Sequence, residues 1–231
     1  MRNRKMFFVL VSLFLCLPLV FGFSSPKSKT TGGAAASTGG AAYPYLIDNF
    51  EDGDTVKAPE WFTFDGIEAK AEKNINKKKG AKNSLGAYSL GLTGSTNKWY
   101  VGGMGTMLGI DATKYKSLEM DIYGNGEGSG KLKIEFYDDD NGNNEIEVDS
   151  KWVPTRDDLL FVEIDVNWRG WKHISIPFGR LKLANKGYGN GAFDPNLKNG
   201  SGGLVKVQII CVANAEDGSV NYSIDNLELG N

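Results

Sequence analysis

Hydrophobic residues occupy every second position over residues 160–168 of this chain, as Leu, Val, Ile, Val and Trp, and the positions between them are polar except for Phe161. A period of two is the pattern of a β-strand with one buried face. After a two-residue break the alternation resumes over residues 171–178, so we predict that the two segments are adjacent strands of a hairpin. The parity places Trp168 in the core, and it places Trp171 on the opposite, exposed face beside the only histidine, His173.

Shorter alternating segments recur along the rest of the chain. Residues 117–123 place Leu, Met and Ile on one side, and residues 131–137 do the same with Leu, Ile and Phe. Thirty glycines, often with Asn and Asp beside them, supply turns between such segments. No segment has a clear helical pattern, and no repeat of solenoid length is visible. We therefore predict an all-β fold, an antiparallel β-sandwich or jelly roll.

The N-terminus has the layout of a secretory signal peptide over residues 1–22, in which three basic residues precede an apolar stretch. Two alternatives stay open, an uncleaved membrane anchor and a lipoprotein acylated at Cys16. Residues 23–42 consist mostly of Ser, Thr, Gly and Ala, which is typical of a flexible linker. Residues 43–231 have the length of one β-domain. We predict an exported protein, periplasmic or extracellular, without membrane contact after cleavage.

Charge and cysteine content argue against several functional classes. Loss of the signal peptide removes three of 26 basic residues and none of the 28 acidic ones, so the mature chain is mildly acidic. Such a chain offers no electrostatic surface for nucleic acid. Cys211 is then the only cysteine, which rules out an internal disulfide, and its apolar neighbours predict burial. With one histidine and no nucleophile or zinc motif, we predict no enzyme, although the many carboxylates leave a glycosidase pair open.

An acidic cluster at residues 138–145 invites a calcium-binding interpretation. The EF-hand pattern fails there, because counting back from Gly142 puts the first ligand position on Tyr137. We expect an Asn-Gly hairpin turn instead, joining strands at residues 131–137 and 145–148.

A second acidic cluster, at residues 48–54, opens the domain, and Asp225 lies in its last predicted strand. First and last strands of a sandwich are often neighbours, so we predict a structural calcium ion with Glu51 and Asp225 as ligands. Acidic side chains that cap a turn are the alternative. We expect no other cofactor.

The polar positions of the alternating strands carry tyrosines, carboxylates, amides and the histidine. Flat aromatic rings can stack on the apolar faces of sugars, and planar polar groups can bind pairs of hydroxyls. A sheet face with this mixture fits sugar recognition. An ordinary solvated face is the alternative, since any antiparallel sandwich places polar residues outward.

Four segments resemble the family-eleven carbohydrate-binding modules, namely DNFEDGD (48–54), SLEMDIYGN (117–125), GWKHISIPF (170–178) and YSIDNLEL (222–229). The resemblance implies a galactose-binding-like jelly roll whose glycan lies across a concave sheet face. Carried over by strand position, it implies these ligand-binding residues: Asp121, Tyr123, Tyr137, Asp165 and His173. Trp171 joins them because it shares the parity of His173.

A narrower resemblance is to the flagellar filament outer-layer (sheath) proteins of spirochaetes, carried by residues 50–54, Trp61 and residues 170–178. It implies a periplasmic, non-catalytic coat that contacts flagellin, other coat proteins or a glycan. Our leading hypothesis is therefore a structural coat protein of a periplasmic flagellar filament. The alternative is a secreted carbohydrate-binding module or polysaccharide-associated binding protein. The Gly- and Asn-rich segment 184–203 is longer than the expected connections, and we predict either an interaction loop or a mobile one.

Overall fold

The computed structural model of the protein describes residues 43–57, 59–74 and 86–231. The predicted signal peptide (1–22) and linker (23–42) lie outside the described residues. No helix of the described part is long and apolar enough to cross a membrane. The elements are β1 (Tyr45–Asp48), β2 (Phe62–Asp65), β3 (Glu68–Lys73), β4 (Tyr88–Ser95), β5 (Tyr100–Ile110), β6 (Ser117–Asn125), β7 (Lys131–Asp138), β8 (Asp158–Asp165), β9 (Arg169–Pro177), the 3-10 turn η1 (Phe178–Arg180), β10 (Lys182–Leu183), β11 (Leu204–Val212) and β12 (Ser219–Gly230).

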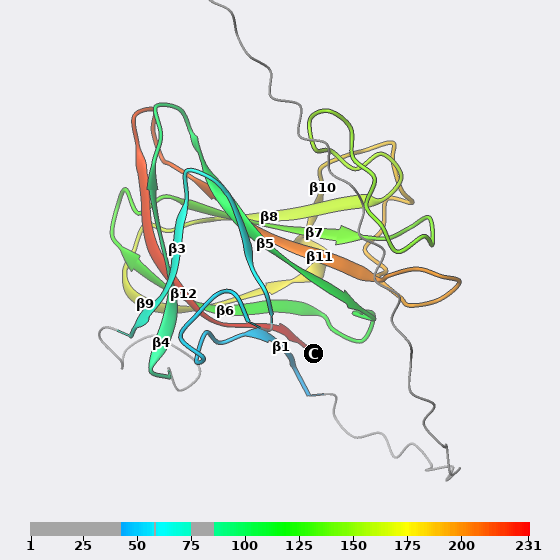
Figure 1. Ribbon diagram of the computed structural model, residues 1–231, viewed down its shortest axis with the longest axis horizontal. Coiled ribbons are helices and arrows are strands. Elements are labelled where there is room, and N and C mark those ends of the chain that lie inside the picture. Colours follow the sequence, from blue (N-terminus) through cyan, green and yellow to red (C-terminus); the bar gives the residue numbers. More distant parts are fainter. Residues whose placement is uncertain (1–42, 58, 75–85) are drawn as a thin grey trace, which may run out of the picture. The chain divides into compact units, whose positions relative to one another are not determined.

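The strands form two six-stranded antiparallel sheets. Sheet A has the order β3-β4-β12-β6-β9, and β1 pairs with β12. Sheet B has the order β10-β8-β7-β11-β5-β2. In Figure 1, the strands β8, β7 and β11 of sheet B lie above β6 and β9 of sheet A. The predicted antiparallel β-sandwich of the jelly-roll type is confirmed.

The core lies between the inner faces of the two sheets. Strands β6 and β7 supply six side chains without exposed surface, Leu118, Met120, Ile122, Leu132, Ile134 and Phe136. These are the positions that the alternation over residues 117–123 and 131–137 predicted. Cys211 on β11 is buried as expected, and burial raises the pKa of its thiol to about 12.

The predicted hairpin at residues 160–178 is wrong. Strand β8 pairs with β7 in sheet B, whereas β9 pairs with β6 in sheet A, so the short connection between them crosses from one sheet to the other. The two strands face each other across the open edge of the sandwich, where both line a cavity of about 300 Å³. Alternation identifies the buried face of each strand but carries no information about its partner, and that explains the error.

The burial of the tryptophans on this segment also differs in part from the prediction. Trp168 packs against the core, as its parity indicates. Trp171 lies on the outer face of sheet A beside His173, yet it is only 4% exposed. Its ring packs edge-on against Tyr123, with 5.5 Å between the ring centroids. The alternation therefore predicted the correct face of the sheet for Trp171, but the neighbouring Tyr123 covers its ring.

The expected hairpin turn after β7 is also wrong. The strands that pair with β7 are β8 and β11, and residues 139–157 form a long loop in which Val148 makes one isolated bridge to Pro154. The segment 184–203 packs against the end of sheet B. Phe193 packs edge-to-face against Phe136, with 5.7 Å between the ring centroids, and the backbone carbonyl of Pro195 accepts a hydrogen bond from the N–H of Ala112.

Candidate functional site

Side chains from five strands line up in rows on the outer face of sheet B. One row crosses β8, β7, β11, β5 and β2 and holds Phe161, Glu135, Gln208, Gly105 and Phe62. The next row holds Glu163, Lys133, Ile210, Gly103 and Phe64. A shorter row holds Tyr137, Lys206 and Met107. We refer to these three rows as the sheet B face.

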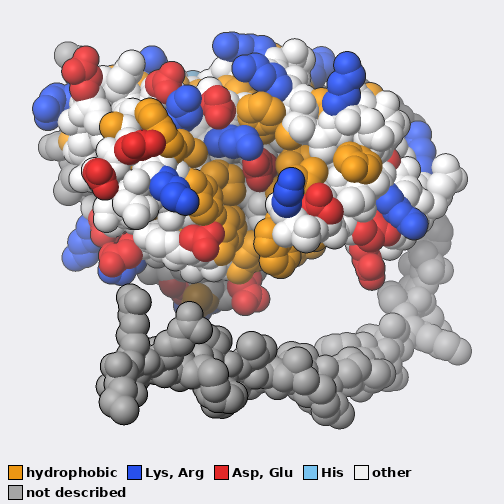
Figure 2. Space-filling view, turned by 90° about the horizontal axis from the view of Figure 1, so that it is seen from above, with side chains coloured by type: hydrophobic (Ala, Val, Ile, Leu, Met, Phe, Trp, Pro, Cys, Tyr) orange, Lys and Arg blue, Asp and Glu red, His pale blue; other side chains and the backbone are white. Residues whose placement is uncertain are grey.

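Figure 2 views the molecule from above relative to Figure 1, and therefore from the side of sheet B. Hydrophobic side chains gather in a hollow in the middle of this face, and charged side chains surround them. A surface that combines exposed apolar groups with a polar surround is typical of a binding site.

Two phenylalanine rings from the edge strand β2 lie over two glycines of β5. A Cβ atom added to Gly105 would lie 2.6 Å from Cζ of Phe62, and one added to Gly103 would lie 2.6 Å from Cζ of Phe64. The two ring centroids are 6.2 Å apart, and the rings are tilted by 32° to each other. Since Phe62 is 42% exposed, the glycines allow an aromatic platform to lie close to the sheet while one of its rings reaches solvent.

A polar network occupies the centre of the sheet B face. The hydroxyl of Tyr137 lies 2.7 Å from Oε1 of Gln208 and 3.1 Å from Oε2 of Glu135. Nζ of Lys133 donates to Oε1 of Glu135 at 2.6 Å. No hydrogen bond among the described residues uses Nε2 of Gln208, so this donor is available to a ligand.

Two lysines of this face lie against aromatic rings. Nζ of Lys206 lies 3.8 Å from the ring centroid of Tyr137, and Nζ of Lys133 lies 4.5 Å from that of Phe161. Burial lowers the pKa of Lys206 and raises that of the Tyr137 hydroxyl. These neighbours fix the positions of the central polar groups, so a ligand would meet an arrangement that is largely preformed.

A second aromatic group stands at one end of the same sheet. Trp99, which is 52% exposed, lines a cavity of about 340 Å³ together with Lys131, Asp165 and Asn167. The carboxylate of Asp165 lies 3.6 Å from Nζ of Lys131. Of the six predicted ligand-binding residues, Asp165 and Tyr137 lie on the outer side of sheet B, where Asp165 is exposed and Tyr137 is only 4% exposed.

The other four predicted ligand-binding residues lie together on the outer face of sheet A. Asp121 pairs with His173, and Tyr123 pairs with Trp171 across β6 and β9. Nδ1 of His173 lies 3.0 Å from Oδ1 of the fully buried Asp121, and its Nε2 lies 3.3 Å from Glu119. The structure thus divides the six residues between two opposite outer faces, and those on sheet A belong to a largely buried network.

The two predicted calcium ligands are engaged by nitrogen donors. The carboxylate of Glu51 accepts the backbone N–H groups of Ala87 and Tyr88, both at 2.9 Å. Nδ2 of Asn74 lies 3.3 Å from Asp225, 3.1 Å from the carbonyl of Gly86 and 2.8 Å from that of Tyr88. Burial raises the pKa of Asp225 to about 7. A neutral amide donor thus occupies the point where these oxygens converge, so the residues fit a cation poorly, and the calcium site at Glu51 and Asp225 stays a prediction.

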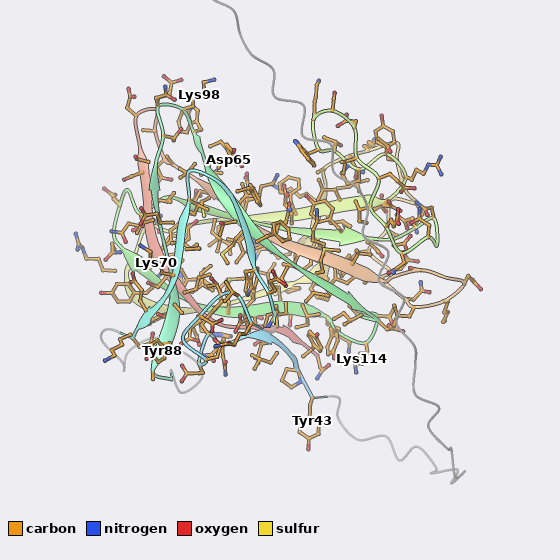
Figure 3. All side chains as sticks on the ribbon, viewed as in Figure 1. Tyr43, Asp65, Lys70, Tyr88, Lys98 and Lys114 are labelled. Carbon is orange, nitrogen blue, oxygen red and sulfur yellow. The ribbon has the colours of Figure 1, made fainter. Side chains whose placement is uncertain are left out.

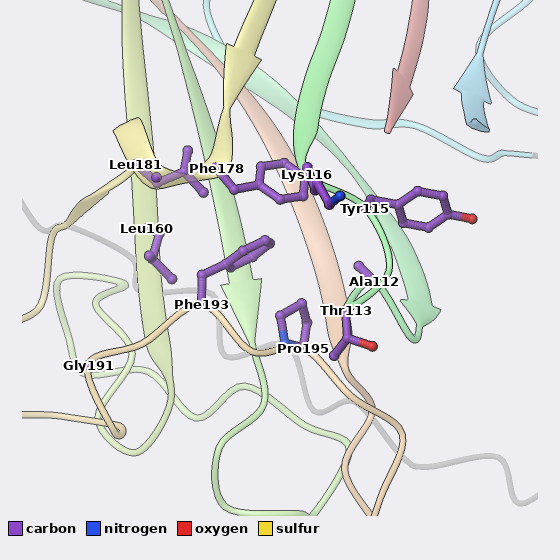
Figure 4. A pocket seen from close by; sticks show the side chains of 11 residues that line it. Ala112, Thr113, Tyr115, Lys116, Leu160, Phe178, Leu181, Gly191, Phe193 and Pro195 are labelled. Carbon is purple, nitrogen blue, oxygen red and sulfur yellow. The ribbon is translucent and has the colours of Figure 1, made fainter. Parts of the chain in front are cut away.

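A cavity of about 520 Å³ lies elsewhere, between the loop after β5 and the segment 178–195. Its walls include Leu160, Phe178, Leu181 and Phe193 (Figure 4). Phe178 and Phe193 pack edge-to-face, with 4.8 Å between the ring centroids, and both also pack edge-to-face against Phe136 of the core. This hollow is a continuation of core packing, and it offers a ligand few polar side chains.

Phe62, Phe64 and Trp99 were not among the ligand-binding residues predicted from the sequence. A signal for the first two exists in the sequence, because both positions have the same parity on β2, and the facing strand β5 carries glycine at two alternate positions, Gly103 and Gly105. Small residues repeated on one face of a strand indicate that something lies over that face.

A scan against models of protein families finds no match, and neither does a search of curated proteins. Among solved structures, an exo-β-agarase is similar over 81% of this chain and 25% of its own, with a TM-score of 0.53 and 16% identity. The family 11 carbohydrate-binding module from Clostridium thermocellum, in complex with a β-1,3-1,4-mixed-linked tetrasaccharide, covers 83% of this chain and 97% of its own, at 16% identity and a TM-score of 0.48.

At such identities the likeness concerns the fold alone, and it agrees with the two-sheet architecture. The similar structures include carbohydrate-binding modules with a β-sandwich fold. They give no support to the flagellar sheath interpretation, which therefore rests on the sequence resemblance alone.

Proposed function

We propose that the protein is a non-catalytic glycan-binding module and that the sheet B face is its binding surface. The observation that carries the proposal is the preformed arrangement of aromatic rings on both sides of a central polar network. Phe62 and Phe64 lie on one side, Phe161 lies on the other, and Gln208 presents an unused donor between them. Rings of this kind stack on sugar faces, while amide and carboxylate groups bind hydroxyls.

The central carboxylate supports binding rather than catalysis. Glu135 is engaged by both Lys133 and Tyr137, whereas a glycosidase needs two carboxyl groups on opposite sides of the scissile bond, one of them free to exchange a proton. From the predicted signal peptide we infer that the glycan lies outside the cytoplasm. This part of the proposal rests on the sequence alone.

A binding screen with matched variants tests the proposal. The purified protein is applied to a glycan array and to affinity gels that contain soluble β-glucans, galactans or agarose. Loss of a stacking ring in Phe62→Ala should weaken binding about fivefold, since one aromatic contact contributes on the order of 1 kcal/mol. Gln208→Ala should weaken it similarly.

Tyr43→Ala is the control, because Tyr43 is 89% exposed and projects below β1, away from sheet B (Figure 3). It should bind as the unchanged protein does. Binding that is equally strong in all three variants, or absent for every glycan tested, would contradict the proposal.

A further inference from the structure

Four aspartates from three segments meet at the end of sheet B opposite Trp99. Asp138 ends β7, Asp140 follows it, Asp158 begins β8, and Asp194 belongs to the segment 184–203. One carboxylate oxygen from each of Asp138, Asp140 and Asp194 lies within 4.8 Å of the other two. This spacing allows a single cation to contact all three oxygens, because calcium–oxygen distances are about 2.3–2.6 Å.

Two oxygens of this group are buried and accept no hydrogen bond from an amide, ammonium or hydroxyl group of the described residues. They are Oδ1 of Asp158, a residue without exposed surface, and Oδ2 of Asp140. A side chain added to Gly189 would collide with both of these oxygens at once. Both therefore point to one place beside the Gly189 backbone, where either a proton shared by the two carboxyl groups or a bound cation must separate the oxygens. A buried acceptor without a donor is destabilising, and more so when it is charged.

The other oxygens of the group accept only neutral donors. The N–H of Gly191 donates to Oδ2 of Asp158 at 2.6 Å, and the N–H of Asp194 donates to Oδ2 of Asp138 at 2.9 Å. Nδ2 of Asn190 bridges Asp194 and Asp140. In the described part of the chain, none of the ion pairs joins a Lys or Arg to these carboxylates.

Burial and the crowding of like charges favour the protonated form of these carboxyl groups. Burial, together with the neighbouring carboxylates, raises the pKa of Asp138 to about 8 and that of Asp140 to about 7. Lys198 lines the adjacent cavity of about 210 Å³ but forms no ion pair with the group. The same cavity has Asn190, Asn196 and Asp194 in its walls, and it gives solvent a route to the carboxylates.

We propose that Asp138, Asp140, Asp158 and Asp194 bind one divalent cation, which is Ca²⁺ by the chemistry of the donors. The ligands are all oxygens, at two strand ends and on the loops beside them. Ca²⁺ accepts six to eight oxygen ligands in flexible geometry, with water completing the set. The ion fastens the segment 184–203 to the end of sheet B. The EF-hand test on residues 138–145 could not find this site, because its ligands come from three separate segments.

Calcium titration of the full chain tests the site. The protein is treated with chelator, dialysed, and titrated with CaCl₂ by calorimetry while its melting temperature is followed. Calcium at one hundred times its Kd should raise the melting temperature by about 5–10 °C. The variants Asp140→Asn and Asp158→Asn should lose this response. In chelator, the melting temperature of each variant should equal or exceed that of the unchanged protein, because each substitution removes one repelling charge. A substitution that merely damaged the fold would lower the melting temperature instead.

Two controls locate the ion. Glu145→Gln, an exposed residue of the same loop, should respond to calcium as the unchanged protein does. The calcium anomalous signal in crystals should lie among the four aspartates, a test that requires no variant. The proposal is overturned if calcium leaves the melting temperature unchanged. It is also overturned if the response persists in Asp140→Asn and Asp158→Asn but disappears in Glu51→Gln, or if the anomalous peak lies elsewhere.

Discussion

Two glycines on one strand should respond very differently to the same substitution. Gly103 and Gly105 both lie under phenylalanine rings on β5, and neither has a positive φ. A Cβ on Gly105 would meet Cζ of Phe62 at 2.6 Å and Cγ of Gln208 at 2.8 Å, which are both side-chain atoms. A Cβ on Gly103 would meet Cζ of Phe64 and also the backbone carbonyl oxygen of Ile209, each at 2.6 Å.

These contacts determine the cost of each alanine. Ordinary contact begins at 3.4 Å, so the ring of Phe62 must retreat by about 0.8 Å in Gly105→Ala, and its exposure leaves room for that movement. The cost of about 1 kcal/mol is offset by the 0.4–1 kcal/mol that alanine gains through the unfolded state. In Gly103→Ala the obstacle is the backbone of β11, which is paired on both sides. A backbone shift there costs about 1–3 kcal/mol.

Thermal melting and denaturant titration measure the difference. Gly105→Ala should change the melting temperature by about 3 °C or less, whereas Gly103→Ala should lower it by about 2–8 °C more than Gly105→Ala does. On the proposed function, Gly105→Ala should nevertheless weaken glycan binding about fivefold, because it lifts the ring of Phe62. Equal destabilisation by the two variants, or unchanged binding by Gly105→Ala, would refute the contact reasoning.

Three further outcomes are expected. His173→Ala should lower the free energy of unfolding by about 1–3 kcal/mol in urea titration and leave glycan binding unchanged, because it removes a partner of the buried Asp121 on the other sheet; weaker binding would contradict this. In chelator, the melting temperature should fall as the pH rises from 5 to 8. The pKa values of Asp138 and Asp140 are about 8 and about 7 in the folded protein, above those of the unfolded chain. The stability that protonation of these groups contributes is therefore complete below about pH 4 and is lost as the pH rises through these folded-state pKa values. A melting temperature that stays constant or rises with pH would contradict this. The buried thiol of Cys211 should resist a thiol reagent at pH 8 until the protein is unfolded; modification of the folded protein would contradict this.

The fold class could be read from the sequence because alternation records burial directly. Leu118, Met120 and Ile122 show this, and so does Cys211 in its apolar run. Strand partners could not be read in the same way. Sheet membership depends on contacts between distant residues, such as those of Asp158–Asp165 with Lys131–Asp138, and the long loop between these strands concealed that pairing.

The candidate site was predictable only in part. Tyr137 and Asp165 were both predicted from the resemblance to the family-eleven modules, by their positions on the strands. The aromatic platform was missed because Phe62 and Phe64 form a strand of only four residues, which has too few positions to show a pattern. The cation site was missed for a different reason, since its four aspartates meet only after residues 138–140, 158 and 194 have been brought together.

The central claim, that the sheet B face binds glycan, is tested most directly by nuclear magnetic resonance on the isotope-labelled protein. A bound oligosaccharide from the screen is titrated in, and the shifts of backbone and side-chain amide signals are mapped. We predict the largest shifts at the side-chain amide of Gln208 and the backbone amides of Gly103 and Gly105, with little change at His173. Shifts that gather around His173 and Asp121 on sheet A would contradict the account.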